Sequence, residues 1–191
     1  MTETGTGDEG PDYAERIAAS ADVHSNAWQQ TVEDMNAIAE DLEDEGWDVL
    51  TIPAGHTAPT NPDAGATDRF GLVHVVPGNK ADDIEETVET GAFPQYRVFR
   101  KEMQGRVFMV TQLLDPETEQ AILIAGNFEL RHAPGLVKTA LEEEDMYTHL
   151  QKLDKTHLAS FRHDEVEHFF PNPHRYEDYE VDFGADSSDD E

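Results

Sequence analysis

The chain has 191 residues, of which 42 are acidic and 13 basic, so its formal net charge is −29. A hydrophobic content of 37%, with apolar runs such as AILIAG, is too high for an entirely disordered acidic chain. The absence of cysteine excludes disulfides, thiolate metal sites and cysteine nucleophiles. The basic residues are scattered, and nucleic acid is disfavoured as a partner because it binds basic surfaces. Their one loose group is Arg97, Arg100, Lys101 and Arg106.

The net charge favours a folded protein that works in very high salt. At 1 M salt the Debye length is about 3 Å, which screens the self-repulsion of so many carboxylates. We therefore expect a halophilic cell as the source. The start MTETGTGDEGPD is polar and acidic, unlike a signal peptide, and no apolar run reaches the length of a membrane span. A cytoplasmic protein with no membrane partner is the resulting expectation.

Composition along the chain predicts one folded domain between two disordered ends. Residues 1–11 form a polar lead, and residues 177–191 form a tail with eight acidic residues. The span 12–176 between them holds the apolar runs and is predicted to be a single α+β domain.

The first half of this domain begins with a long helical pattern. Trp28, Val32, Met35 and Leu42 recur at helical spacing between acidic residues, and Gly46 is placed to end the helix. The stretch WDVLTIP then predicts a strand, residues 53–69 a long loop, FGLVHVV a second strand, and NKADDIEETVETG a short helix.

The second half is rich in strands. Short turn-like links join FPQYRVFRKEM, RVFMVTQLL and QAILIAGNFEL, which predicts an antiparallel meander. HAPGLVKTALEEE predicts another short helix, and MYTHLQKL with HLASFRH a hairpin. The whole pattern predicts an α+β fold with a mainly antiparallel sheet of five to seven strands, a long N-terminal helix and two shorter helices.

The segment FRHDEVEHFFPNPHRY near the C-terminus raises the question of a metal site. His163 and His168 are five residues apart, whereas ligands on one helix face are three or four apart. Burial of Phe169 and Phe170 is the simpler interpretation, and it makes the segment a structural anchor. A metal site that includes His174 is the minority alternative, so no metal ligand and no cofactor is assigned.

Two further histidines, His149 and His157, flank the predicted hairpin turn and are expected to be cross-strand neighbours. Such a pair can bind a metal ion, but a third ligand is not evident from the sequence, and a hydrogen-bonded or solvated pair is the commoner arrangement. A metal site centred on these two and His163 is kept as a hypothesis, and His132 is a further residue that could approach the same region.

Known catalytic patterns are incomplete. The strand LVHVV with its preceding loop has the outline of a nuclease core, but His74 stands where a carboxylate is needed and Lys80 is too far along. None of the few serines lies in Gly-x-Ser-x-Gly, and there is no phosphate-binding loop or dinucleotide fingerprint. The catalytic residues are therefore unknown, and the balance is against an enzyme.

Three stretches, AILIAGNFELRHAPGLVKTA, MYTHLQKLD and FRHDEVEHFFP, together with the acidic composition, resemble an uncharacterised family of halophilic archaeal proteins, a domain of unknown function. The resemblance implies no activity.

The residues favour a non-enzymatic protein-interaction or regulatory module, acting on a protein partner or as a homodimer. Candidate contact surfaces are the aromatic stripe Phe93, Tyr96 and Phe99, or the first helix near Trp28, although an ordinary core position is the commoner role for such residues. The alternative is a small-ligand binder or enzyme with a pocket under residues 53–69. Its candidate residues are His56, His74, Asp63 and Asp68.

Overall fold

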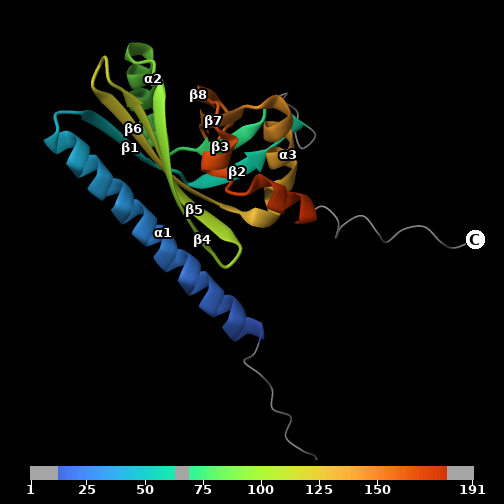
Figure 1. The fold of residues 1–191 in the computed structure, drawn as a ribbon. Coiled ribbons are helices and arrows are strands. Elements are labelled where there is room, and N and C mark those ends of the chain that lie inside the picture. Colours follow the sequence, from blue (N-terminus) through green and yellow to red (C-terminus); the bar gives the residue numbers. More distant parts are fainter. Residues whose placement is uncertain (1–12, 63–68, 180–191) are drawn as a thin grey trace, which may run out of the picture.

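The computed structural model describes residues 13–62 and 69–179 (Figure 1). Their eight strands form two mixed four-stranded sheets, accompanied by a long N-terminal helix and shorter helices. The predicted α+β class and the predominance of antiparallel pairing are therefore confirmed. The predicted lead, and the predicted tail from residue 180 onward, lie outside the described residues.

The first sheet, sheet A, contains the predicted meander. Its strand order is β1 (Asp48–Pro53), β6 (Gln120–Glu129), β5 (Arg106–Asp115), β4 (Gln95–Met103). β5 pairs antiparallel with both neighbours, and β1 pairs in parallel with β6. In the tight turn between β4 and β5, Gln104 has φ 48° and Gly105 has φ 77°. Positive φ at both central residues is what a two-residue type I′ hairpin turn requires.

The second sheet, sheet B, has the order β2 (His56–Thr60), β3 (Gly71–Val75), β7 (Met146–Gln151), β8 (His157–His163). The predicted β7–β8 hairpin is present, and β3 pairs in parallel with β7. The prediction of a loop throughout 53–69 is wrong, because β2 lies within it. Pro59 and the Gly/Ala/Thr-rich composition hide this strand, which lies at a sheet edge where proline is tolerated.

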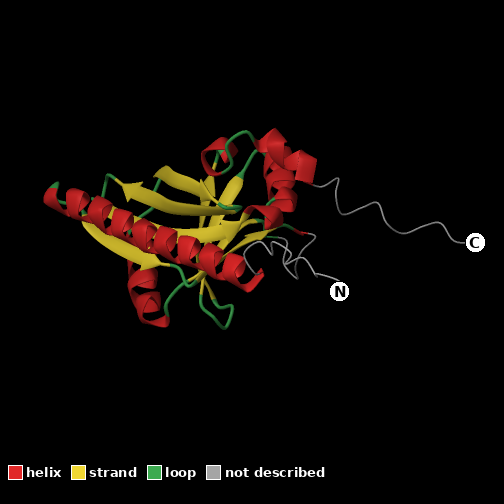
Figure 2. Cartoon of the chain, turned by 90° about the horizontal axis from the view of Figure 1, so that it is seen from below, coloured by secondary structure: helices red, strands yellow, loops and turns green. Residues whose placement is uncertain are grey.

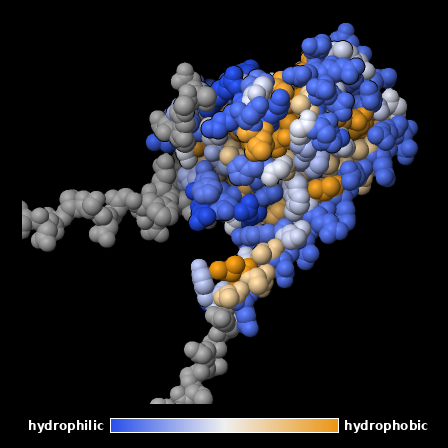
Figure 3. All heavy atoms as spheres, turned by 180° about the vertical axis from the view of Figure 1, so that it is seen from behind, coloured by the Kyte–Doolittle hydropathy of each residue, from blue (hydrophilic) through white to orange (hydrophobic). Residues whose placement is uncertain are grey.

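The long helix α1 (Tyr13–Asp44) crosses the outer face of sheet A (Figures 1 and 2). Met35 and Ala39 are buried there against Val110, Leu123 and Ala125 of the sheet. The first turns of α1 project beyond the sheet, where Figure 3 shows hydrophobic surface near the start of the described chain. Tyr13 and Ile17 are exposed in these turns.

The main core lies between the two sheets, because alternate side chains of each strand point inward. Ile52, Leu113, Ile122 and Ile124 of sheet A meet Leu150 of sheet B in one cluster. The helix α2 (Ala81–Thr90) contacts β8, and α3 (Pro134–Glu143) packs beside the 3-10 helix η4 (Pro173–Tyr179). The remaining short segments are η2 (Gly78–Lys80), η3 (Leu130–His132) and α4 (Val166–Phe169).

The segment FRHDEVEHFFP is the predicted anchor. Phe169 and Phe170 are both buried, and Phe170 makes edge contacts with Phe128 of β6 and Tyr176 of η4. The C-terminal segment is thereby fixed to the core between the sheets.

Candidate functional site

One polar cluster on sheet B is a serine hydrogen-bonded between two histidines. Ser160 of β8 lies directly opposite His149 of β7. The Ser160 Oγ is 2.7 Å from His149 Nδ1 and 2.6 Å from His157 Nε2. A register shift between Leu150 and Gln151 accompanies this arrangement, and the irregularity lets His157 and Ser160, three residues apart on β8, meet on one face of the sheet.

The hydrogen bonds of this cluster fix where its protons lie. The Nε2 of His149 is 2.9 Å from the carbonyl oxygen of Phe70, and a carbonyl can accept only, so Nε2 carries the proton. In the neutral ring the Nδ1 of His149 then accepts from the Ser160 hydroxyl. Because that hydroxyl has a single proton, His157 Nε2 must donate to the Ser160 Oγ. Burial lowers the pKa of His149, which favours this neutral form.

A glycine allows the Phe70 carbonyl to reach His149. Gly71 has φ 139°, and a Cβ atom at this position would meet the backbone oxygen of Tyr147 at 2.3 Å. Only glycine therefore lets the chain pass so close to β7. Tyr147 completes the setting, because its ring stacks on His149 at 5.7 Å and meets the edge of Phe70.

The structure brings the predicted pair His149 and His157 together through Ser160. The hypothesis of a metal site that also includes His163 is wrong, because His163 lies on the opposite face of sheet B. In the described ranges 13–62 and 69–179, no three His, Asp or Glu side chains are grouped to hold a metal ion. Sequence reasoning missed Ser160, because the predicted turn at residues 154–156 would have placed Phe161 opposite His149, and the observed register is shifted between Leu150 and Gln151.

Two buried histidines face the core between the sheets. His74 Nδ1 is 2.8 Å from Thr57 Oγ1, and His163 Nε2 is 2.8 Å from Thr148 Oγ1. Burial lowers the pKa of His74 to about 3 and that of His163 to about 4. Among the described residues, the second ring nitrogen of each has no hydrogen-bond partner. These residues are structural, neutral histidines.

The predicted pocket under residues 53–69 does not assemble from the residues expected. His56 is exposed at the start of β2, whereas Thr57 and His74 face the core, so the two histidines lie on opposite faces of sheet B. Asp63 and Asp68 lie outside the described residues.

The other predicted histidines are dispersed. His168 is exposed on α4, with its Nδ1 3.2 Å from Glu165. His174 is exposed in η4, and His132 is exposed in η3. The buried His163 shares no ligand site with them.

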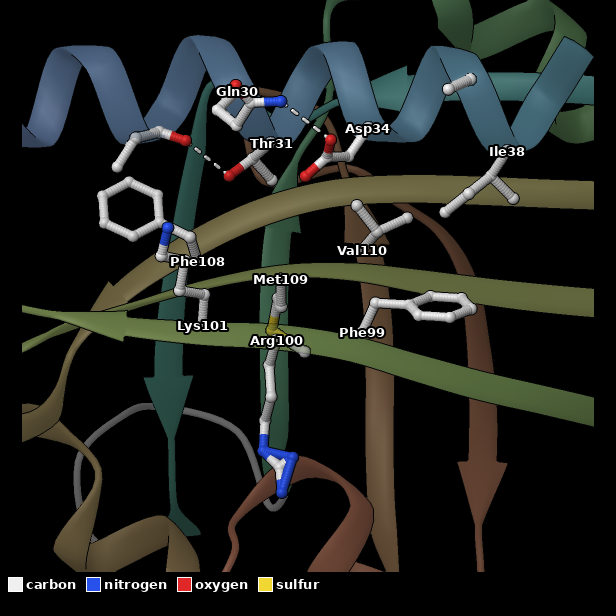
Figure 4. A pocket seen from close by; sticks show the side chains of 12 residues that line it. Gln30, Thr31, Asp34, Ile38, Phe99, Arg100, Lys101, Phe108, Met109 and Val110 are labelled. Atoms are coloured by element: carbon white, nitrogen blue, oxygen red, sulfur yellow. Dashed lines mark hydrogen bonds between the residues drawn. The ribbon is translucent and has the colours of Figure 1, made fainter.

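A second candidate is a groove of about 430 Å³ between α1 and the strands β4 and β5 (Figure 4). Its rim on α1 carries Gln30 and Asp34, joined by a 2.9 Å hydrogen bond. Its floor is apolar, and Figure 4 shows Phe99 and Val110 on the helix side of the sheet, with Arg100 pointing away from α1. Ile38 of α1 also lines the groove, and the strands contribute Phe99, Lys101, Phe108 and Val110.

The groove borders an edge strand. In the part of the chain that the structure describes, β4 pairs with β5 alone. Three of the chain's 13 basic residues, Arg97, Arg100 and Lys101, lie on this strand with one acidic residue, Glu102. Phe99 is 44% exposed between them. This is a cationic strand edge on a strongly anionic protein.

The predicted aromatic stripe does not form one surface. Phe93 is buried against Phe161, and the Tyr96 hydroxyl accepts a hydrogen bond from the backbone N–H of Glu165. Trp28 of α1 is partly buried against the cluster between this helix and sheet A. Phe99 alone of the stripe reaches the groove.

The described residues form a two-sheet α+β fold with a cationic edge strand and a histidine–serine cluster. A family model matches residues 14–171, and the chain belongs to that family, a family of unknown function (DUF7529). No curated protein and no solved structure is significantly similar to the chain. None of the helices in the described residues is long and apolar enough to cross a membrane.

Proposed function

We propose that the protein is an interaction module that binds an extended acidic segment of a protein partner along β4. The observation that carries this proposal is the outer edge of β4, which has no strand partner among the described residues and lies beside an apolar groove. An added strand gains main-chain hydrogen bonds from the edge, and alternate side chains gain contacts with the groove. Phe99, Phe108 and Ile38 supply the apolar contacts.

Charge favours an acidic occupant over a second copy of this chain. An antiparallel β4–β4 pairing centred on Phe99 would place Arg97 of one copy opposite Lys101 of the other, and like charges directly opposite are destabilising. An acidic strand would instead pair with Arg97 and Lys101. A homodimer through this edge is therefore an outcome of the test below and not the proposal.

We further propose that the protein works in the cytoplasm of a halophilic cell, without nucleic acid or membrane as partners. The net charge of −29 supports this proposal, because multimolar salt screens the repulsion that such a charge creates. In such salt, strand pairing and apolar contact supply the affinity, and the cations select the register and the partner.

Site-specific crosslinking tests the interaction. A photoreactive phenylalanine analogue would replace Phe99, and a control protein would carry it at Leu153, which is 87% exposed in the turn between β7 and β8. Irradiation in a native lysate at multimolar potassium chloride is expected to give a crosslink to an acidic peptide from position 99 only. An Arg97→Glu/Lys101→Glu variant should lose that crosslink. The control variant Lys138→Glu makes the same kind of charge reversal on α3, away from β4, and should keep it. Crosslinks to this chain itself, or equal yields from positions 99 and 153, would contradict the proposal.

A further inference from the structure

The cluster of Ser160, His149 and His157 has a geometry that the interaction function does not use. The hydroxyl of Ser160 points its proton at a neutral imidazole nitrogen of His149, 2.7 Å away. That imidazole is held by its other nitrogen on the Phe70 carbonyl at 2.9 Å. A nucleophile, a base and a group that orients the base are the elements by which hydroxyl nucleophiles are activated.

The three side chains differ in solvent exposure, and the nucleophile is the one that a substrate must be able to reach. Ser160 is exposed, so a substrate can approach its Oγ, whereas His149 is buried to 5% exposure behind it. His157 is exposed and donates its Nε2–H to the same Oγ at 2.6 Å. When the Oγ becomes bonded to carbon, this N–H is free to donate to a developing oxyanion nearby.

We propose that Ser160 is a nucleophile that hydrolyses small carboxylic esters, with His149 as its general base and His157 as a hydrogen-bond donor. The Ser160 Oγ attacks the ester carbonyl carbon while its proton passes to His149 Nδ1. The bond from carbon to the alcohol oxygen then breaks, and the alcohol leaves with that proton. A water molecule gives a proton to His149 and attacks the acyl-serine, which releases the carboxylic acid and returns the proton to the Ser160 Oγ.

Charge and exposure define the substrate class further. The positive charge of Arg69 acts on both His149 and His157, so the site favours a neutral or anionic ester over a cationic one. Ser160 lies on an open sheet face, and substrates with small acyl groups fit this setting better than those that need a deep pocket.

The test uses a fluorescent fluorophosphonate, in which the activated serine Oγ displaces fluoride from phosphorus. The full-length protein is expected to be labelled once, with the label mapped by mass spectrometry to the peptide that contains Ser160. Ser160→Ala should abolish labelling. Ser25→Ala, which removes an exposed serine of α1, should leave labelling unchanged. Circular dichroism confirms that each variant is folded.

The histidine variants separate an activated serine from a merely hydrogen-bonded one. His149→Gln is expected to reduce the labelling rate by about 100-fold or more, as loss of a general base does. His157→Phe should cost about 100-fold, and His157→Gln less, since its amide keeps an N–H donor. The same order should hold for hydrolysis of p-nitrophenyl acetate.

Three results would overturn the proposal: a folded protein that is not labelled at Ser160, equal labelling of Ser160 and Ser25, or labelling that is unaffected by both histidine changes. If His149→Gln does not fold, the exposed positions 157 and 160 still decide the question. The interaction proposal is independent of these results, because β4 and this cluster belong to different sheets.

Discussion

The imidazole of His74 lies directly over the Cα of Gly126, across the space between the two sheets. A Cβ atom at position 126 would come within 2.8 Å of His74 Cε1 and within 2.7 Å of Thr57 Oγ1. The absence of a side chain at Gly126 of β6 thus leaves the space that the buried Thr57–His74 hydrogen bond of sheet B occupies.

Gly126→Ala is therefore expected to destabilise the protein by about 1–3 kcal/mol, since the added methyl group must displace His74 or Thr57. Urea denaturation gives the free energy of unfolding. Gly78→Ala is the matched control, because a Cβ there meets nothing within 4 Å. Equal losses for the two variants would show that the space over Gly126 adapts without cost.

Stability should fall as the pH is lowered from 6.5. The folded-state pKa values of His74 and His163 are lowered from 6.5 to about 3 and about 4. Between these values and 6.5 the unfolded chain binds more protons than the folded one, so acid favours unfolding. The stabilising contribution of both histidines is complete above pH 6.5 and is lost progressively below it.

The variant His163→Gln isolates one of these groups. Its amide cannot titrate, so the slope of the free energy of unfolding against pH should decrease by up to one proton between pH 4.5 and 6.5. Exposed His56→Gln serves as the control for loss of a histidine side chain outside the core. A His163→Gln slope identical to that of the unmodified protein would contradict burial of a neutral His163.

Truncation of the C-terminal anchor should be costly. Phe170→Ala removes a fully buried ring from between Phe128 and Tyr176, and we expect a loss of about 3–5 kcal/mol. Thermal and urea unfolding measure this loss, with Leu153→Ala as an exposed control. Near-equal stabilities would mean that the segment 166–176 does not hold the core together.

The two ends of α1 should respond differently to the same kind of change. Met35→Ala removes a side chain buried against Val110 and Leu123, at an expected cost of about 2–5 kcal/mol. Ile17→Ala, in the exposed first turns, should be nearly neutral. If Ile17→Ala were as damaging in the isolated protein, the first turns of α1 would have to contact the body.

Local sequence patterns were sufficient to predict those elements whose conformation depends on neighbouring residues. The α1 stripe, the tight turn at Gln104 and Gly105, and the burial of Phe169 and Phe170 all follow from neighbouring residues. Partition of the strands into two sheets depends on parallel pairs between distant segments, such as Leu72 with Thr148, which no local pattern specifies. The strand β2 was missed for a related reason, because it is held by its partner β3 and not by its own propensities.

The candidate sites divide in the same way. The hairpin predicts that His149 and His157 are near each other, although the cross-strand partner of His149 is Ser160, and the Phe70 carbonyl that orients His149 comes from 79 residues away. The groove at Phe99 requires the crossing of α1 over sheet A, which helical spacing alone does not define.

The two parallel pairs also govern the order in which the molecule can assemble. In sheet A, Asp48 pairs with Gln120, 72 positions later in the chain. In sheet B, Leu72 pairs with Thr148, 76 positions later. During synthesis, β1 must wait for β6, and the β2–β3 hairpin must wait for β7 before it gains an inner neighbour. Contacts of such long range slow folding to the millisecond-to-second regime. A nascent chain that ends before Met146 would expose the inner edge of β3, and β7, in the last quarter of the chain, is what covers it.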